Sequence, residues 1–267
     1  MQQEDIDCWD HFSTRLAQLK ATREEARSSH LGVSKFLFRG HENADWNLAT
    51  TLERLTNSDW SFSKYFELIS RAKPQIESFT DRHWEFENLP KLREWASNYD
   101  NLKMSPFPAY DYLVYLRHHG FPSPLLDWTR SPYVAAYFAF TQPSTDRVAI
   151  YVYWEDSGCG KSSSSNHPQL VSFGPYVKTH SRHFLQQSQY TISAKFKANE
   201  WGFASHEEVF ASGQEHQDHL WKFTLPSSER KQVLKILDAH NLNTFSLFQN
   251  EEALLRTIAT REVELRE

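Results

Sequence analysis

The sequence predicts an α+β fold in which a mixed or antiparallel sheet is flanked by helices. Two observations lead to this class. Apolar residues recur at helical spacing through most of the first half of the chain. In the second half, runs that alternate with period two lie between helical segments without forming regular β-α-β units.

The first expected element is a helix over about residues 4–28. Charged residues fill the face opposite an apolar stripe that consists of Ile6, Trp9, Phe12, Leu16 and Leu19. The next segment, LGVSKFLFRG, changes to period two and predicts a strand. Phe36 and Phe38 face one side of this strand, and Leu37 and Arg39 face the other. An arginine at the end of a buried strand, followed by Gly40, is unusual.

Helical segments follow this strand. ENADWNLATTLERL is a connection that leads into a short helix, and residues 61–98 are helical with a kink or break at Pro74. NLPKLREW begins a further helix, so we expect a helical insertion over about residues 55–105. PAYDYLVYLRHHG is another helix, which Gly120 closes and Pro122 follows.

The middle of the chain predicts a strand, a turn and a helix. LLDWT is a strand or tight loop, and Ser131 with Pro132 favours a helix start at SPYVAAYFAF. RVAIYVYW alternates as a buried strand whose inner face consists of Val148, Ile150, Val152 and Trp154. EDSGCGKSSSSNHP is the clearest flexible loop of the chain.

The last third predicts strands and two helices. RHFLQQSQYTI is a turn that enters a strand, HEEVF is a short strand, and HLWKFTLP is a longer strand ended by Pro226. SSERKQVLKILDAHN and NEEALLRTIA are amphipathic helices. A length of 267 residues suits one large domain, so we expect a single domain over residues 1–267.

Composition limits the functional classes. Hydrophobic residues make up 39% and aromatic residues 15% of the chain, which is typical of a globular protein. The net charge of −5 gives no global basic field for nucleic acid, although it is compatible with a local basic patch. Cys8 and Cys159 lack the spacing of a disulfide framework or zinc knuckle, which favours a reducing cytoplasm.

Three further observations concern membranes and metals. The first residues, MQQEDIDCWD, lack the apolar region of a signal peptide. The longest apolar run, YVAAYFAF, is too short to span a bilayer, so we expect no membrane partner. His216 and His219 could hold a metal from one helix, but no carboxylate cluster completes the set, so we predict no metal site.

Three blocks of the sequence together resemble the FRG domain family, which is named for a Phe-Arg-Gly motif. They are FLFRGHENADWNLATTLERL, RHHGFPSPLLDWTRSPYVAAYFAF and RHFLQQSQYT. In the first block, Trp46, Leu48 and Arg54 fill the slots that follow the motif. The resemblance runs from Trp9 to about Phe248.

The sequence departs from the family pattern at three positions. Arg117 stands where the family has Gln, Pro124 where it has Arg, and Ser188 where it has Gly. Roles that belong to those three family residues therefore do not transfer to this chain.

The same blocks are similar to ADP-ribosyltransferases at the level of pattern. The corresponding stretches are FRG, WTRSPYVAAYFA and HEEVF. This similarity implies a split sheet of the ADP-ribosyltransferase type and NAD⁺ as the substrate. It also implies a catalytic Glu at Glu208, while Gln186 matches the Gln of the FRG family.

The chemistry of NAD⁺ assigns roles to the remaining candidates. Arg39 can clamp the pyrophosphate through its planar fork, and Gly40 lets a ligand approach the backbone. Thr129 and Ser131 offer hydroxyls at a helix N-terminus. The alternatives are that Arg39 pairs with Asp127 or a carbonyl group and that Ser131 only caps the helix.

Two further residues are candidates for binding NAD⁺. Tyr137 can stack on nicotinamide, although aromatic residues at helical spacing more often belong to a core. His119 can reach ligand oxygens. The catalytic group is Glu208 or Gln186, and the sequence does not choose between them.

The resemblance implies an NAD⁺-dependent ADP-ribosyltransferase or NAD⁺ glycohydrolase, and it implies a toxin or phage-defence effector as the biological setting. The acceptor, protein or nucleic acid, stays open. A non-catalytic module that binds a nucleotide or nucleic acid through the Arg39 pocket is the alternative. A metal-dependent nuclease or hydrolase is a third hypothesis, which no residue spacing requires.

Overall fold

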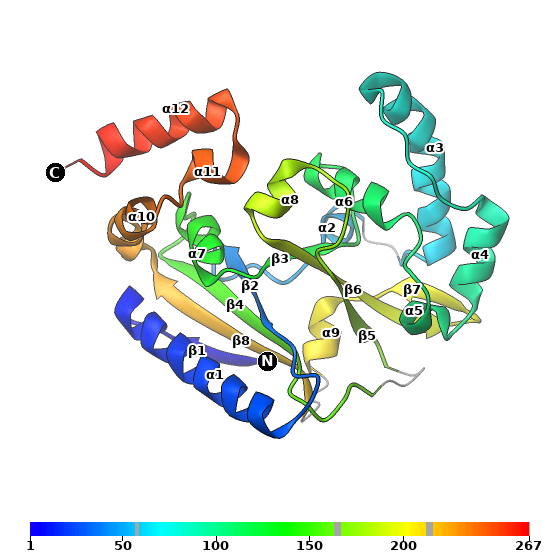
Figure 1. The fold of residues 1–267 in the computed structure, drawn as a ribbon, viewed down its shortest axis with the longest axis horizontal. Helices are drawn as coiled ribbons and strands as arrows, with labels where there is room; N and C mark the ends of the chain where they lie inside the picture. The colour runs from blue at the N-terminus through cyan, green and yellow to red at the C-terminus, as the bar shows by residue number, and fades with distance from the viewer. Residues whose placement is uncertain (57–58, 163–166, 212–215, 267) are drawn as a thin grey trace.

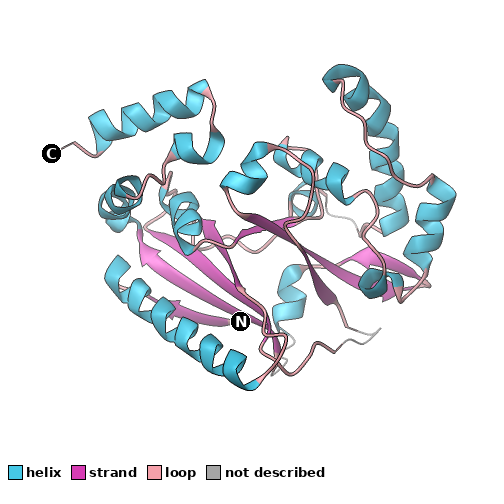
Figure 2. Cartoon of the chain, viewed as in Figure 1, coloured by secondary structure: helices cyan, strands magenta, loops and turns pink. Residues whose placement is uncertain are grey.

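The computed structural model describes residues 1–56, 59–162, 167–211 and 216–266, which form one mixed eight-stranded sheet with helices on its faces (Figures 1 and 2). The strand order is β1-β8-β4-β2-β3-β6-β5, and β7 pairs with β6. Strands β1 and β8 are parallel, and the other paired strands of the described residues are antiparallel. The α+β class expected from the sequence is therefore confirmed.

The strands are β1 (Gln2–Asp5), β2 (Phe36–His41), β3 (Leu126–Thr129), β4 (Arg147–Asp156), β5 (Gln169–Phe173), β6 (Ser188–Lys197), β7 (Glu200–Phe203) and β8 (Gln217–Pro226). The longer helices are α1 (Trp9–Ser29), α3 (Phe62–Thr80), α4 (Leu89–Ser97), α6 (Tyr110–His118), α7 (Pro132–Phe140), α10 (Arg230–Ala239) and α12 (Glu251–Ala259). The shorter helices are α2 (Thr51–Leu55), α5 (Asn101–Met104), α8 (Ser181–Leu185), α9 (His206–Ala211) and α11 (Thr244–Phe248). A 3₁₀ turn (Ser227–Glu229) and a π-helical turn (Thr260–Glu264) complete the elements.

The sheet is nearly divided in its middle. Strands β2 and β3 share a single register pair, Phe38 with Thr129. Strands β1, β8, β4 and β2 form one half, and β3, β6, β5 and β7 form the other (Figure 1). Because β2 and β3 diverge beyond that pair, their edge groups face a gap at the centre of the molecule.

Helices α1, α7 and α10 cover one face of the first half. The inner stripe of α1 packs on the sheet with both Phe36 and Phe38. On β4, the predicted inner face is confirmed, because its four residues belong to the same buried cluster. Burial of this area supplies most of the hydrophobic stabilisation of this half.

Helix α7 lies unusually close to β2. It is apolar nearly all round, as expected for a helix enclosed by the protein. Ser131 caps it by accepting a hydrogen bond from the Val134 amide, so the predicted helix start is confirmed. A Cβ at Gly40 would lie 1.9 Å from the carbonyl oxygen of Ala135. Only glycine therefore permits this approach of helix to strand.

The second half of the sheet packs against the helical segment that follows α2. Helices α3, α4 and α6 bury an aromatic cluster against β6 and β7. A smaller cluster lies on the other face of the sheet, where Leu37 meets Trp128 and Phe210. Leu37 therefore faces away from Phe36 and Phe38, which confirms the alternation predicted for this strand.

Four expectations about secondary structure are wrong. Residues 2–5 are a strand instead of the start of α1, because they pair in parallel with β8. Residues 61–98 are not one helical run, because α3 ends at Thr80 with left-handed Asp81 as its C-cap, and Pro74 lies inside α3 without breaking it. HEEVF is part of helix α9, where adjacent Val209 and Phe210 are both buried. His219 lies on strand β8, so His216 and His219 do not share a helix.

Part of the expected loop at residues 155–168 lies outside the described residues, because positions 163–166 are not described. The described part is tied down by Lys161, whose ammonium group contacts Asp218 at 2.7 Å and Glu155 at 3.1 Å. In the described ranges, no helix has the length and apolar character needed to cross a membrane.

Candidate functional site

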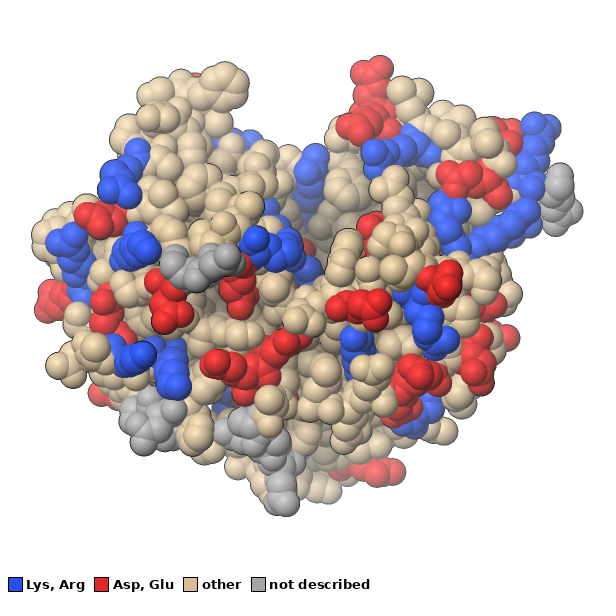
Figure 3. Space-filling model, turned by 180° about the vertical axis from the view of Figure 1, so that it is seen from behind, with Lys and Arg blue, Asp and Glu red and all other residues tan. Residues whose placement is uncertain are grey.

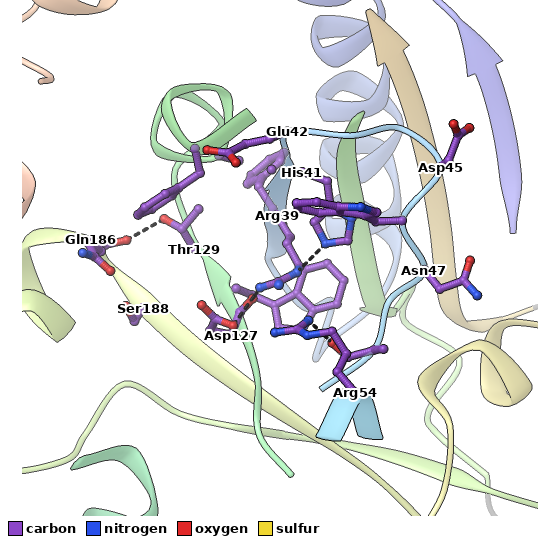
Figure 4. A pocket seen from close by; sticks show the side chains of 17 residues that line it. Arg39, His41, Glu42, Asp45, Asn47, Arg54, Asp127, Thr129, Gln186 and Ser188 are labelled. Atoms are coloured by element: carbon purple, nitrogen blue, oxygen red, sulfur yellow. Dashed lines mark hydrogen bonds and ion pairs between the residues drawn. The ribbon is translucent and has the colours of Figure 1, made fainter. Parts of the chain in front are cut away.

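A cleft of about 700 Å³ opens where β2 and β3 diverge. Its walls come from β2, the 42–54 connection, β3, α7 and the turn between α8 and β6. The polar residues that line it, labelled in Figure 4, are Arg39, His41, Glu42, Asp45, Asn47, Arg54, Asp127, Thr129, Gln186 and Ser188. This volume lies within the range of pockets that hold cofactor-sized ligands.

Arg39 spans the gap between the two halves of the sheet. Its Nη1 donates to the backbone carbonyl of Asp127 at 2.8 Å and to the carboxylate of Asp127 at 2.7 Å. The alternative stated for Arg39, an arginine paired with Asp127 or a carbonyl, is thus present in the structure. Within the described part of the chain, Nη2 has no hydrogen-bond acceptor, so half of the guanidinium fork remains for a ligand.

A second arginine shares the same carboxylate. Arg117 on α6 donates from Nη2 to Asp127 Oδ1 at 2.5 Å. Although burial opposes its ionisation, the guanidiniums of Arg117 and Arg39 hold the pKa of Asp127 well below its usual value. Asp127 is therefore an anionic bridge between α6, β2 and β3, and Arg117 has a structural role as one of its two partners.

His41 fixes the orientation of Arg39. It follows Arg39 by two residues and so projects from the same face of β2. Arg39 Nε donates to His41 Nε2 at 2.9 Å, which places the imidazole proton on Nδ1. Burial, together with the charge of Arg39, lowers the pKa of His41 to about 3. The ring is therefore neutral and acts as an acceptor at physiological pH.

Arg54 adds a third guanidinium to the site. It lies at the end of α2, whose start is fixed by a capping box between Thr50 and Glu53. Arg54 donates to the Ala49 carbonyl at 2.8 Å and forms no ion pair with any described residue. Burial, and then the charges of Arg39 and Arg117, lower its pKa, so these cations repel one another. An anionic ligand would relieve that repulsion.

The hydroxyl groups predicted for the site are already engaged. Thr129 lines the cleft, but its Oγ1 donates to the Gln186 carbonyl at 2.7 Å and accepts from the Ser131 amide at 3.1 Å. Ser131 is buried as the N-cap of α7 and does not line the cleft. Both hydroxyls therefore shape the turn that leads into α7, as the structural alternative for Ser131 predicted.

Gln186 is brought to the cleft by the turn between α8 and β6. Its side-chain amide donates to the Leu247 carbonyl at 3.4 Å, a long hydrogen bond. In the view of Figure 4, Gln186 and Glu42 lie toward the Thr129 side, and Arg54 lies toward the opposite side. The structure thus brings Arg39, Gly40, Thr129 and Gln186 together, as the sequence predicted.

The other three predicted residues lie elsewhere. Glu208 on α9 lines a different cleft of about 680 Å³, beside Lys195 and Glu200. His119 caps the C-terminus of α6 and stacks on Tyr115. Tyr137 is buried, and its hydroxyl hydrogen-bonds Thr244 Oγ1 at 2.7 Å. Tyr137 therefore belongs to the core, as its helical spacing also allowed.

Several cleft residues were not selected from the sequence. Glu42, Trp46 and Phe138 line the cleft, and the side chain of Trp46 is half exposed. Burial raises the pKa of Glu42, while a hydrogen bond from the Gln142 backbone acts in the opposite direction. His41 could have been found from the sequence, because it lies two residues after Arg39 and so shares its face of the strand. Arg54 carried a signal only through the FRG block.

Charge on the molecular surface is local rather than global. On the face shown in Figure 3, acidic and basic side chains are interspersed, and basic side chains lie in the hollow between the two upper projections. The described residues contain no group of three His, Cys, Asp or Glu placed to hold a metal ion.

Comparison with known proteins gives one match. A family model described as FRG domain matches residues 34–147. No curated protein and no solved structure matches the chain. The matched segment contains the first two blocks identified in the sequence and every cleft residue named above except Gln186 and Ser188. The resemblance of the third block stays a prediction.

Proposed function

Because the chain belongs to the FRG domain family, we propose that its central cleft binds NAD⁺ and supports ADP-ribosyl transfer or NAD⁺ hydrolysis. The observation that carries the proposal is the arrangement of charge in the cleft. Arg39 and Arg54 both line this space. Among the described residues, Asp127 is the one carboxylate that pairs with Arg39, and Arg117 shares it. Glu42 and Asp45 also line the cleft, so the positive charge is local: it lies where the guanidiniums of Arg39 and Arg54 face the same space. A pyrophosphate placed there could contact both guanidiniums.

The remaining walls suit the rest of the dinucleotide. Trp46 and Phe138 offer aromatic surface to a nicotinamide or adenine ring. Gln186 and Glu42 offer a hydrogen-bonding amide and a carboxylate to a ribose. These four residues come from three separate segments of the chain, which meet at the cleft between β2 and β3.

The reaction breaks the bond between ribose C1′ and the nicotinamide nitrogen. Nicotinamide leaves with the bonding electron pair and becomes neutral, and the ribose acquires oxocarbenium character. Water or an acceptor nucleophile then bonds to C1′ and loses its proton. In this proposal the Glu42 carboxylate stabilises the developing positive charge, and Gln186 orients a ribose hydroxyl.

Glu208 has no part in this arrangement. The similarity to ADP-ribosyltransferases points to it, but Glu208 lines a separate cleft. A non-catalytic nucleotide-binding module is therefore the second candidate. It is favoured by the hydrogen bonds that occupy Thr129 and by the absence of Glu208 from the lining of the cleft.

The first experiment measures ligand binding by thermal shift. ADP-ribose and NAD⁺ should raise the melting temperature of the wild-type protein, because a ligand that binds only the folded state stabilises it. Arg54→Ala should abolish most of the shift. Arg54 is exposed and unpaired among the described side chains, so this variant should fold. Arg93→Ala is the matched control, since Arg93 is an exposed arginine far from the cleft that pairs with Glu67.

The second experiment measures turnover with labelled NAD⁺. Release of nicotinamide, or transfer of label to protein, DNA or RNA, would support the enzyme, and Glu42→Gln should reduce the rate. Stabilisation by ADP-ribose without turnover would favour the binding module instead. If neither ligand stabilises the protein and no turnover occurs, the proposal fails. Toxicity of the expressed protein that Arg54→Ala relieves would support a toxin or phage-defence setting.

A further inference from the structure

A second group of basic side chains, two arginines and two histidines, lies outside the Arg39 cleft. It consists of Arg82, His119, His180 and Arg182, and we call it the basic strip. These residues come from the connection after α3, the end of α6 and the start of α8. Positive charges from Arg82 and Arg182 lower the pKa values of both His119 and His180, after the larger effect of burial.

Among the described residues, no carboxylate forms an ion pair with the arginines of the basic strip, although Glu85 and Asp111 line a neighbouring cleft with Arg82. Every charged group that shifts the pKa of His119 or His180 is itself a cation or a histidine. Neither Arg82 nor Arg182 forms an ion pair with any residue that the structure describes. Arg182 instead lies 5.3 Å from the ring of Phe248, and its buried Nε has no hydrogen-bond partner among the described residues. Two arginines without a described ion-pair partner favour an anionic ligand, and the neutral histidines beside them can donate hydrogen bonds to it.

The strip is continuous in space. The guanidinium of Arg82 lies 5.3 Å from the ring centre of Tyr115. The ring of Tyr115 lies 4.2 Å from that of His119, which in turn lies 5.6 Å from that of His180. One phosphate group cannot reach all of these donors, because together they extend over several ring-to-ring steps. The strip therefore fits a chain of phosphates better than a single anion.

The tautomer of His180 supports this assignment. His180 is the N-cap of α8, where its Nδ1 accepts a hydrogen bond from the Arg182 amide at 3.2 Å. The ring proton of neutral His180 therefore lies on Nε2 and is available to a phosphate oxygen. The capping contact also fixes the position of Arg182 relative to His180.

An aromatic groove borders the strip. It has a volume of about 540 Å³ and lies between the ends of α3 and α6. Phe79, Phe121 and His119 line it together with Tyr115, and the side chain of Phe79 is 92% exposed. Aromatic rings beside cations are typical of proteins that bind single-stranded nucleic acid, because bases stack on the rings while phosphates meet the cations.

From these contacts we infer that the basic strip and the groove beside it form a binding site for single-stranded nucleic acid. Phosphates contact Arg82, His180 and Arg182, and a base stacks in the groove against Phe79. The site is separate from the Arg39 cleft and does not rest on the proposed NAD⁺ chemistry. The net charge of −5 is no obstacle, since a local patch determines the field that a bound strand meets.

The test is fluorescence anisotropy with a labelled oligothymidylate of about ten nucleotides, a length typical of such sites. The wild-type protein should bind at low salt, and affinity should fall as salt rises. Arg82→Ala and Arg182→Ala should each weaken binding about threefold to tenfold and reduce the salt slope by about one unit. Arg27→Ala, an exposed arginine on α1, is the matched control and should bind as the wild type does.

Phe79→Ala separates a nucleic-acid site from a plain anion site. Since Phe79 is almost fully exposed, its loss should leave the fold intact and weaken only the oligonucleotide. Inorganic polyphosphate should bind this variant as tightly as it binds the wild type. Melting temperatures of all variants confirm that they are folded.

Four outcomes would overturn the inference. They are no binding at low salt, equal affinity of Arg82→Ala and Arg27→Ala, no effect of Phe79→Ala, or loss of binding only in Arg54→Ala. The last result would show that the oligonucleotide binds in the Arg39 cleft instead. Capture of a folded protein partner by this face without any oligonucleotide binding would also count against the inference.

Discussion

Asp127→Asn tests the bridge that joins the two halves of the sheet. The substitution keeps the shape of the side chain but removes the negative charge shared by Arg39 and Arg117. Both guanidiniums contact Oδ1, at 2.7 and 2.5 Å. The side chains of Arg39 and Arg117 are only 14% and 17% exposed, so water cannot fully replace the lost charge.

The expected cost follows from burial and screening. Removing one partner of a fully buried ion pair costs about 3–5 kcal/mol. The side chain of Asp127 is 40% exposed to the cleft, so solvent screening reduces this figure. We therefore expect the free energy of unfolding to fall by about 2–3 kcal/mol. For a chain of this size, that corresponds to a lower melting temperature by about 4–12 °C.

The assay is urea denaturation at pH 7. The control, Asp146→Asn, changes an exposed aspartate that forms no ion pair with described residues and should cost less than about 0.5 kcal/mol. Adding Arg117→Gln to Asp127→Asn should recover part of the loss, because it removes one uncompensated cation. A loss below about 0.5 kcal/mol for Asp127→Asn, or no recovery in the double variant, would refute the bridge.

The pH dependence follows from the same contacts. The pKa of Asp127 is lowered in the folded state, so the stability it contributes is fully present above the unfolded pKa of about 3.9. It is lost as the pH falls through the folded pKa. The difference between wild type and Asp127→Asn should therefore stay constant from about pH 5 to pH 8 and shrink below about pH 4.

Three further substitutions test other parts of the fold and site. Gly40→Ala should cost about 3 kcal/mol or more, because its Cβ would lie 1.9 Å from the Ala135 carbonyl oxygen, whereas Gly174→Ala should cost less than about 0.5 kcal/mol in the same urea assay. Equal stabilities of these two variants would contradict the close packing of α7 on β2. Ser131→Ala should lose about 1 kcal/mol by removing the N-cap of α7, and an unchanged urea midpoint would argue against that cap. Glu208→Gln should leave the thermal shift by ADP-ribose unchanged, because Glu208 lines a different cleft. Loss of the shift would instead place Glu208 in the Arg39 site.

Much of the fold was predictable because local patterns decide it. The alternation of β2 and β4, the capped start of α7 and the amphipathic α10 follow from periodicity and capping residues. The errors arose where a distant partner decides the conformation. Residues 2–5 become a strand only because β8 offers a parallel edge, and no local pattern records that edge.

The candidate site shows the same division. Arg39 was identifiable from its unusual place at the end of a buried strand, and Gln186 from its family block. Glu208 carried an equally good local pattern, yet its helix turns it into another cleft. Gly40 was assigned to ligand approach, whereas the backbone of α7 fills the space where its side chain would be.

By itself, the sequence determined most of the helices and strands, the faces that they bury, and that an arginine stands where a strand should be apolar. Only the tertiary structure decided which polar groups meet. The split between β2 and β3, the shared carboxylate of Asp127 and the convergence of Arg54 depend on segments far apart in the chain. Periodicity reports the environment of one segment, while a binding site depends on the distances between several.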